Sequence, residues 1–362
     1  MKKIYTLILK VTLMQLSKWF VNILSSGFGF IAGGRGILKH LFPIRLFVFF
    51  LLFLDISCGG FQNVEKIEKI KPPADIEESI LVQKAPSSQL SKKSKRKKGT
   101  ISKEISVFET KEAKQRAHDY AKIKTFREGE KVTYAFSWFV VKAGTVTLEV
   151  HPFVYVGDRK AYHFVGTVKS SATMDLIHSV DDWIESYVDV ETFYPLKSAL
   201  HGIETDRLRE GLILFDYENK KIDYWMKRVH LKKGEKEKRL TDILVPGVLD
   251  MFSSAFFLRT QKLEVGKIYH TDIYNEGKRI TVDAEVLRQE KLETAIGIFD
   301  VLVIRPVTRF EGVLKTSGDS TIWVTADERH LVLQVETEIK IGYLKGKVIK
   351  IEDPEYSLPT QP

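Results

Sequence analysis

The chain has 362 residues, 44% of them hydrophobic, a formal net charge of +9 and a single cysteine. This length fits one or two domains, and one cysteine excludes both an internal disulfide and a zinc site built from several cysteines. Residues 1–57 contain seven Lys and Arg and one Asp, so +6 of the net charge lies there. The rest of the chain is nearly balanced, which argues against a nucleic-acid-binding protein.

A signal for export is predicted in residues 1–57. Residues 46–54, LFVFFLLFL, form an uncharged apolar run after Arg45. The run is shorter than the roughly 20 residues of a membrane-spanning helix and has the length of a signal-peptide core. This signal is complete from about residues 36–38, where we expect translation to begin. An uncleaved membrane anchor and a free exported protein are the alternatives.

The only cysteine, Cys58, directly follows this signal. Ser57 and Cys58 with two glycines behind them resemble a bacterial lipobox, although Asp55 stands where Leu is usual. The resemblance implies a diacylglycerol on the Cys58 thiol and cleavage of the chain before it. We therefore expect a lipoprotein of the bacterial envelope that faces the periplasm. Gly59 after the cysteine favours the outer membrane over the inner one.

A disordered tether is predicted over residues 58–122, because its Pro, Ser, Lys and Glu content leaves too few apolar residues for a core. Residues 106–122 have the composition of one short helix. The tether contains a basic run of Lys92, Lys93, Lys95, Arg96, Lys97 and Lys98. This run is either a contact for anionic lipid or envelope polymer, or a solvated spacer.

From residue 123 to 352, apolar and polar residues alternate in short runs such as KVTYAFSWFVV (131–141). Alternation with period two predicts antiparallel strands that have one face in water. NEGK (275–278) and YLKGK (343–347) are predicted hairpin turns. Residues 353–362 are expected to form a tail.

One segment breaks the alternation. PGVLDMFSSAFFLR (246–259) carries apolar residues at helical spacing, with a proline suited to a first turn. Such an apolar helix needs a concave partner. We therefore predict an all-β, mainly antiparallel domain, either a curved sheet or a partly open β-barrel, packed on one central helix.

Several blocks resemble family 3108 of the bacterial domains of unknown function, in the family's order over about residues 126–352. They are EGEKVTYAFSWFVVKAGTVTLEV, VDDWIESYVDVETFYPL, GVLDMFSSAFFLR, LEVGKIYHTDIY, TAIGIFDVLVIRP and IWVTADERHLVLQVETEIKIGYLKGKV. The second block contains an acidic pair before a strand and an Asp-x-x-Thr turn. The resemblance implies a fold and an envelope location, often with export or lipidation. It implies no reaction.

Motifs for metal, phosphate or nucleophilic chemistry are missing from the sequence, so we expect no cofactor, no metal and no catalytic residue. The best polar candidate site is Asp181, Asp182, Glu185 and Asp189. On a strand, residues 181, 185 and 189 share one face and 182 points to the other. These carboxylates fit cation binding, sugar hydrolysis or a solvated strand face with a turn.

Aromatic residues form the other candidate. Tyr134, Phe136 and Trp138 share a strand face, and Tyr224 and Trp225 adjoin another strand. They fit either core packing or an apolar cleft for a lipid or glycan.

Together, these features predict a non-enzymatic periplasmic binding or carrier module. Its expected partners are the membrane, through Cys58, and a lipid, a glycan or an envelope protein; nucleic acid is not expected. The alternatives are an enzyme that acts on polysaccharide or peptidoglycan through the 181–189 carboxylates, and a scaffold without a ligand cavity.

Overall fold

The computed structural model describes residues 70–73, 82–84, 125–310, 313–315, 320–339 and 342–354. The export signal, Cys58, the basic run from Lys92 to Lys98, the short helix expected over 106–122 and the tail after residue 354 lie outside these residues. No helix in the described ranges has the length and apolar character needed to cross a membrane.

The first half of the sheet comprises β1 (Val82–Lys84), β2 (Lys131–Trp138), β3 (Val141–Val156), β4 (Arg159–Ser170), β5 (Val180–Asp189), β6 (Pro195–Glu204), β7 (Arg207–Asp216), β8 (Lys221–His230) and β9 (Gly234–Ile243). The second half comprises β10 (Leu249–Asp250), β11 (Ile268–Asn275), β12 (Lys278–Thr294), β13 (Gly297–Phe310), β14 (Val313–Lys315), β15 (Ser320–Thr325), β16 (Val332–Glu338) and β17 (Tyr343–Glu352). Two helices are described, α5 (Ala172–Asp175) and α6 (Met251–Arg259).

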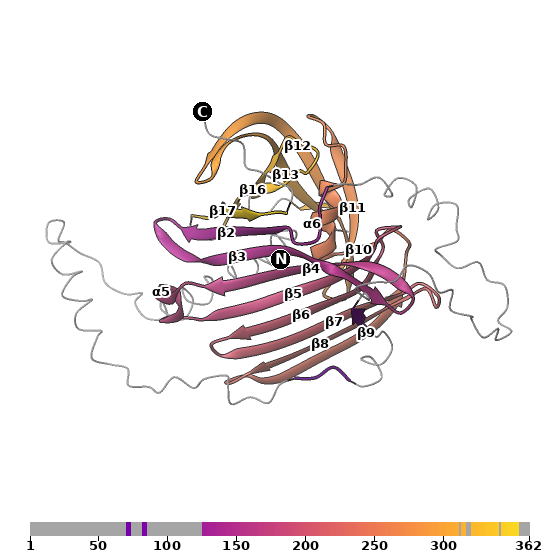
Figure 1. The fold of residues 1–362 in the computed structure, drawn as a ribbon. Helices are drawn as coiled ribbons and strands as arrows, with labels where there is room; N and C mark the ends of the chain where they lie inside the picture. Colours follow the sequence, from indigo (N-terminus) through magenta and orange to yellow (C-terminus); the bar gives the residue numbers. More distant parts are fainter. Residues whose placement is uncertain are drawn as a thin grey trace, which may run out of the picture.

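These strands form one curved, mostly antiparallel sheet (Figure 1). From β2 to β9, each strand pairs with the next one in the chain. On its other side β2 pairs with β17, and the sheet continues through β16, β15, β13, β12 and β11. The pairing of β10 with β11 is parallel. Among the described strands no pairing joins β9 to β10 or β11, so the all-β sheet is open.

The short strand β1 lies within the segment expected to be a disordered tether. Val82–Lys84 pair with Val154–Val156 at the end of β3. At least this part of the predicted tether is therefore attached to the sheet.

The helix α6 begins later than its apolar spacing suggests. The predicted span was 246–259, but the helix starts at Met251 because Asp250 is its N-cap and accepts a hydrogen bond from the amide of Phe252 at 2.9 Å. Gly247 has a φ of +92°, which is not helical. Pro246 therefore lies before the helix and not in its first turn.

Aromatic rings connect α6 to the sheet. The ring of Phe256 stacks on that of Phe164 of β4, with centroids 3.9 Å apart. Phe126, just before β2, meets both rings edge-on at 5.9 Å and 5.2 Å. Stacked and edge-on pairs stabilise beyond their buried area by about 0.5–1.5 kcal/mol each. The helix also contacts β5, β10 and β11 (Figure 1).

The C-terminal end of α6 is fixed by a buried ion pair. Arg259 donates to both oxygens of Glu130, at 2.7 Å and 3.0 Å, and to the carbonyl oxygens of Thr125 and Arg329. The side chain of Arg329 also donates to Glu130 and contacts Asp353. A bidentate pair with these extra bonds offsets the cost of removing the charges from water.

The largest core lies between β2–β4 and β12–β17, and includes Tyr134, Val286, Val301 and Leu333. The β11–β12 turn reaches across to the other half of the sheet, where Lys238 of β9 donates to the carbonyl of Glu276 at 2.9 Å. The curvature therefore brings the ends of β11 and β12 close to β8 and β9, and leaves a space between them that this core does not fill.

Candidate functional site

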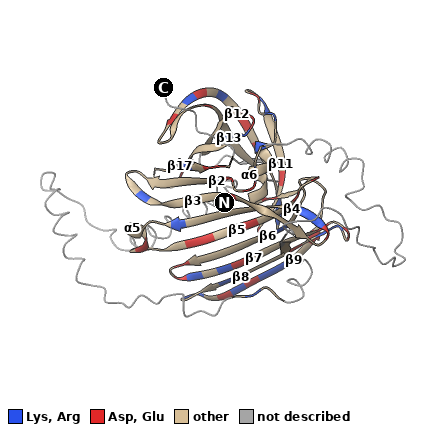
Figure 2. Cartoon of the chain, in the orientation of Figure 1, with Lys and Arg blue, Asp and Glu red and all other residues tan. Residues whose placement is uncertain are grey.

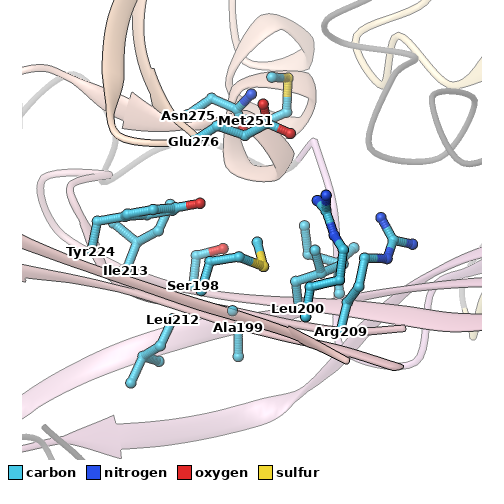
Figure 3. A pocket seen from close by; sticks show the side chains of 14 residues that line it. Ser198, Ala199, Leu200, Arg209, Leu212, Ile213, Tyr224, Met251, Asn275 and Glu276 are labelled. Atoms are coloured by element: carbon cyan, nitrogen blue, oxygen red, sulfur yellow. The ribbon is translucent and has the colours of Figure 1, made fainter. Parts of the chain in front are cut away.

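A cleft lies above the inner face of β6, β7 and β8 (Figure 3). Its floor is formed mainly by Ser198 and Leu200 of β6, Ile213 of β7, and Tyr224 and Met226 of β8. These residues come from alternate positions on adjacent strands, as expected for one face of a sheet. The floor is therefore mostly apolar, with two hydroxyl groups.

The roof comes from the other half of the molecule. Met251 at the start of α6 and the turn residues Asn275 and Glu276 face the floor (Figure 3). Asp250 holds the start of α6 in place, because it also accepts a hydrogen bond from the Ser186 hydroxyl at 2.6 Å. The space between floor and roof is about 610 Å³, including its open mouth.

Two arginines stand at one end of the cleft, directly opposite each other on β7 and β8. Arg209 is buried and forms ion pairs with Asp182 at 2.7 Å and Glu204 at 2.8 Å. Arg228 is half-buried, has no ion pair among the described residues, and its buried Nε has no hydrogen-bond partner. Burial, followed by the charges of Arg209 and Arg207, lowers the pKa of Arg228. Like charges that face each other across a strand pair are destabilising, and an anion between them would relieve this.

Behind Arg209 lies a buried charge network. Burial, only partly offset by Arg209, raises the pKa of the Asp182 carboxyl to about 7. Burial also opposes ionisation of Glu204, but a hydrogen bond with His178 at 3.1 Å and two neighbouring arginines outweigh it and lower the pKa to about 2. The network therefore holds one firmly ionised carboxylate and one that titrates near neutral pH.

One group in the described residues has metal-ligand spacing. His178, Glu204 and Asp206 each offer a ligand atom, all within 4.8 Å of one another. Arg207 and Arg209 both contact the Glu204 carboxylate. Because two guanidinium groups already balance this charge, the group fits an ion-pair network better than a cation site.

The predicted acidic cluster is not gathered into one site. Asp181 is exposed and lies 3.4 Å from Lys169, and Asp182 is buried on the opposite face of β5. Glu185 accepts from the Tyr187 hydroxyl at 3.1 Å. These side chains have separate partners and do not converge on one point.

Asp189, the fourth acidic residue, is buried at the end of β5. It accepts hydrogen bonds from the amide and hydroxyl of Thr192 at 2.8 Å and 2.7 Å, and pairs with Arg159 at 2.7 Å. This is the Asp-x-x-Thr turn of the second sequence block. Its contacts are those of a turn-stabilising residue.

The predicted aromatic face is divided between separate parts of the sheet. Tyr134 and Phe136 are buried in the largest core, and Trp138 packs partly buried against it. Tyr224 lines the cleft, while Trp225 is buried on the opposite face of β8 and donates to Glu237 at 2.7 Å. Of the five predicted aromatic residues, Tyr224 alone lines this cleft.

Sequence reasoning missed the two arginines and the two methionines of the cleft. A signal was present, since Ile222, Tyr224, Met226 and Arg228 alternate along one strand and end in a charge on the inward face. That charge is recognisable as inward only once the buried face is known.

Comparison with known proteins identifies the family of this chain. The family described as "Protein of unknown function (DUF3108)" matches residues 131–348. The chain belongs to this family. The resemblance to family 3108 seen in the sequence is thereby confirmed. No curated protein matches the sequence.

The solved structures that match this DUF3108 protein are distant from it. A β-barrel-like DUF1849 protein from Brucella abortus has 12% identity and a TM-score of 0.39, covering 62% of this chain and 97% of its own. A protein from Bacteroides fragilis with a YmcC-like fold, inferred to be exported, has 9% identity and a TM-score of 0.29, covering 63% and 97%. A protein from Parabacteroides distasonis inferred to be a lipoprotein has 8% identity and a TM-score of 0.24, covering 62% and 95%.

Proposed function

We propose that this DUF3108 protein is a non-enzymatic binding protein of the bacterial envelope whose cleft takes an amphiphile with an anionic group. The apolar part would lie along Ile213, Tyr224, Met226 and Met251. The anionic group, a carboxylate or a phosphate, would pair with Arg228. The observation that carries the proposal is a half-buried arginine, without an ion pair among the described residues, at the end of an apolar cleft.

The geometry supports binding better than catalysis. The acidic side chains expected in an enzyme of envelope polymers have separate partners, as described above. A scaffold without a cavity is disfavoured by the cleft itself. Methionines at the floor and roof suit an apolar chain of variable shape, because their side chains are flexible and polarisable.

The envelope location rests on the signal and the lipobox resemblance at Cys58, with the outer membrane favoured. Incorporation of labelled palmitate into the wild type and not into Cys58→Ser is the expected result for a lipoprotein. Labelling of both proteins, or of neither, would contradict the anchor.

The cleft can be tested with cis-parinarate, a fluorescent fatty acid, and its uncharged methyl ester. We expect the acid to bind at least about tenfold more tightly than the ester, because a hydrogen bond to a charged group contributes about 1.5–3 kcal/mol. Arg228→Met should remove this preference and leave ester binding in place. Lys227→Met is the matched control, since residue 227 lies on the other face of β8 and pairs with Glu235 at 2.9 Å.

Equal binding of acid and ester by the wild type would contradict an anionic ligand. Equal effects of the Arg228 and Lys227 substitutions would show that net charge, and not the cleft, recognises the acid.

A further inference from the structure

An apolar tip lies at the end of the β2–β3 hairpin. This hairpin contributes no residue to the lining of the cleft. Trp138 pairs with Val141, so Phe139 and Val140 form a two-residue turn. Phe139 is 64% exposed, Val140 is 98% exposed and Val141 is 37% exposed. Hairpin turns are normally built from Gly, Asn and Asp, so three consecutive apolar residues are unusual here.

The tip also departs from local backbone preference. Phe139 has a φ of +50°, a region that β-carbon-bearing residues rarely adopt and where the first turn position favours Gly. The aromatic ring lies against Gly342, where an added Cβ would be 2.5 Å from it. A residue that costs conformational energy at this position is consistent with a function for its side chain.

A second apolar loop lies at the same end of the sheet. Leu176 and Ile177, after the short helix α5, are 75% and 57% exposed. The loop adjoins the hairpin, because the amide and hydroxyl of Ser171 donate to the carbonyls of Ala143 and Lys142 at 3.0 Å and 2.7 Å. Figure 1 shows α5 and the β2–β3 turn at the same end of the molecule.

A third element adds an aromatic residue to this end. Leu344 pairs with Trp138, which places Tyr343 beside the β2–β3 turn, and Tyr343 is 49% exposed. The apolar tip surface, as we name it, comprises Phe139, Val140, Val141, Leu176, Ile177 and Tyr343. In Figure 2 the turn of the β2–β3 hairpin carries no charged residue, and the exposed Lys142 follows it in the sequence.

We propose that the apolar tip surface inserts into the interfacial region of a lipid bilayer. Its apolar residues come from the β2–β3 hairpin, the loop after α5 and the start of β17. Trp, Tyr and Lys at its margin are the residues that settle at a membrane–water interface. Other exposed apolar residues, such as Ile243 and Ile298, lie on other strands.

This docking is independent of the cleft and of the lipid on Cys58. A lipid anchor at the far end of a long segment would hold the protein near the membrane without orienting it. Contact through the tip would fix which end of the sheet faces the bilayer. The tip would therefore add orientation to an attachment that is otherwise loose.

The single native cysteine allows a direct test. In the full chain with Cys58→Ser, an environment-sensitive fluorophore is attached at Val140→Cys, at Ile177→Cys or, as a control, at Ile298→Cys. The vesicles contain phosphatidylethanolamine and phosphatidylglycerol. Every variant keeps the same leader, so the label reports the depth of its own site and not the total amount bound.

We expect a blue shift and shielding from an aqueous quencher at positions 140 and 177, and neither at 298. In the Ile177-labelled protein, Val140→Asp should reduce the fraction of shielded label about tenfold at a fixed lipid concentration, because a charge would enter an apolar layer. Circular dichroism checks that this variant is folded. Absence of shielding at position 140 in vesicle-bound protein would overturn the proposal, as would equal shielding at position 298.

Discussion

Arg259 and Arg228 are both withdrawn from solvent, but they lie in different surroundings. Arg259, at the end of α6, donates to both oxygens of Glu130 and to two backbone carbonyls. Arg228 stands beside an apolar cleft with an unpartnered Nε and faces another arginine. Among the described residues, the first cation has hydrogen-bond partners for its guanidinium group, and the Nε of the second has none.

This difference separates a structural ion pair from a binding position. A buried charge that is fully paired fixes the fold, and removing its partner is expensive. A charge left without a partner lowers the stability of the ligand-free protein. An anion that binds to this charge offsets the cost. A buried arginine and a half-buried one can therefore contribute oppositely to stability.

The largest expected effect on the free energy of unfolding comes from breaking the ion pair of Arg259 with Glu130. Glu130→Gln keeps the shape but removes the charge, and should lower the free energy of unfolding by about 3–5 kcal/mol, because it leaves a buried guanidinium uncompensated. Glu149→Gln, whose pair with Lys131 is partly exposed, should cost below about 1 kcal/mol. Denaturant unfolding measures both.

Arg228→Met tests the opposite case, an arginine that is not needed for stability, in the same denaturant unfolding experiment. Its free energy of unfolding should stay within about 1 kcal/mol of the wild type or rise, because the substitution relieves a like-charge pair. A loss as large as that of Glu130→Gln would show that Arg228 is structural and would remove the distinction.

A smaller effect is expected from pH on the network behind Arg209. Because the pKa of Asp182 is raised from 3.8 to about 7, the folded state holds a proton that the unfolded state releases. The stability that this proton provides is complete below the unfolded pKa and is lost as the pH rises through about 7. The wild type should therefore lose stability relative to Asp182→Asn between about pH 5 and about pH 8.

The control for this prediction is Asp181→Asn, which is exposed on the other face of β5. Its free energy of unfolding should follow that of the wild type over the same pH range. A wild type that gains stability relative to Asp182→Asn as the pH rises would mean that Arg209 keeps Asp182 ionised, and would contradict the raised pKa.

Much of the fold follows from alternation in the sequence. The NEGK turn is present between β11 and β12, where Glu276 and Gly277 have positive φ values. The predicted YLKGK turn is wrong, because Tyr343–Glu352 forms one strand. Gly346 lies in mid-strand to make room for the ring of Phe136, which an added Cβ would approach to 2.3 Å. A glycine required by a distant side chain cannot be told from a turn glycine in the sequence alone.

The hairpin tip shows the opposite error. Residues 131–141 look like one continuous strand, because Phe139 and Val140 are apolar and carry no turn signal. The structure turns there and exposes both side chains. The cleft was equally hidden, since its floor and roof come from segments such as Tyr224 and Glu276 that meet only through the curvature of the sheet.

The edge strand β9 has a consequence for self-association. All ten of its residues, GEKEKRLTDI, are exposed, and charges of both signs alternate along it (Figure 2). An open sheet edge is a template on which a second copy of the chain can add a strand. The charges on β9 oppose such pairing, because each neighbouring copy would have to desolvate them. An open sheet can then be kept at high protein concentration without polymerising.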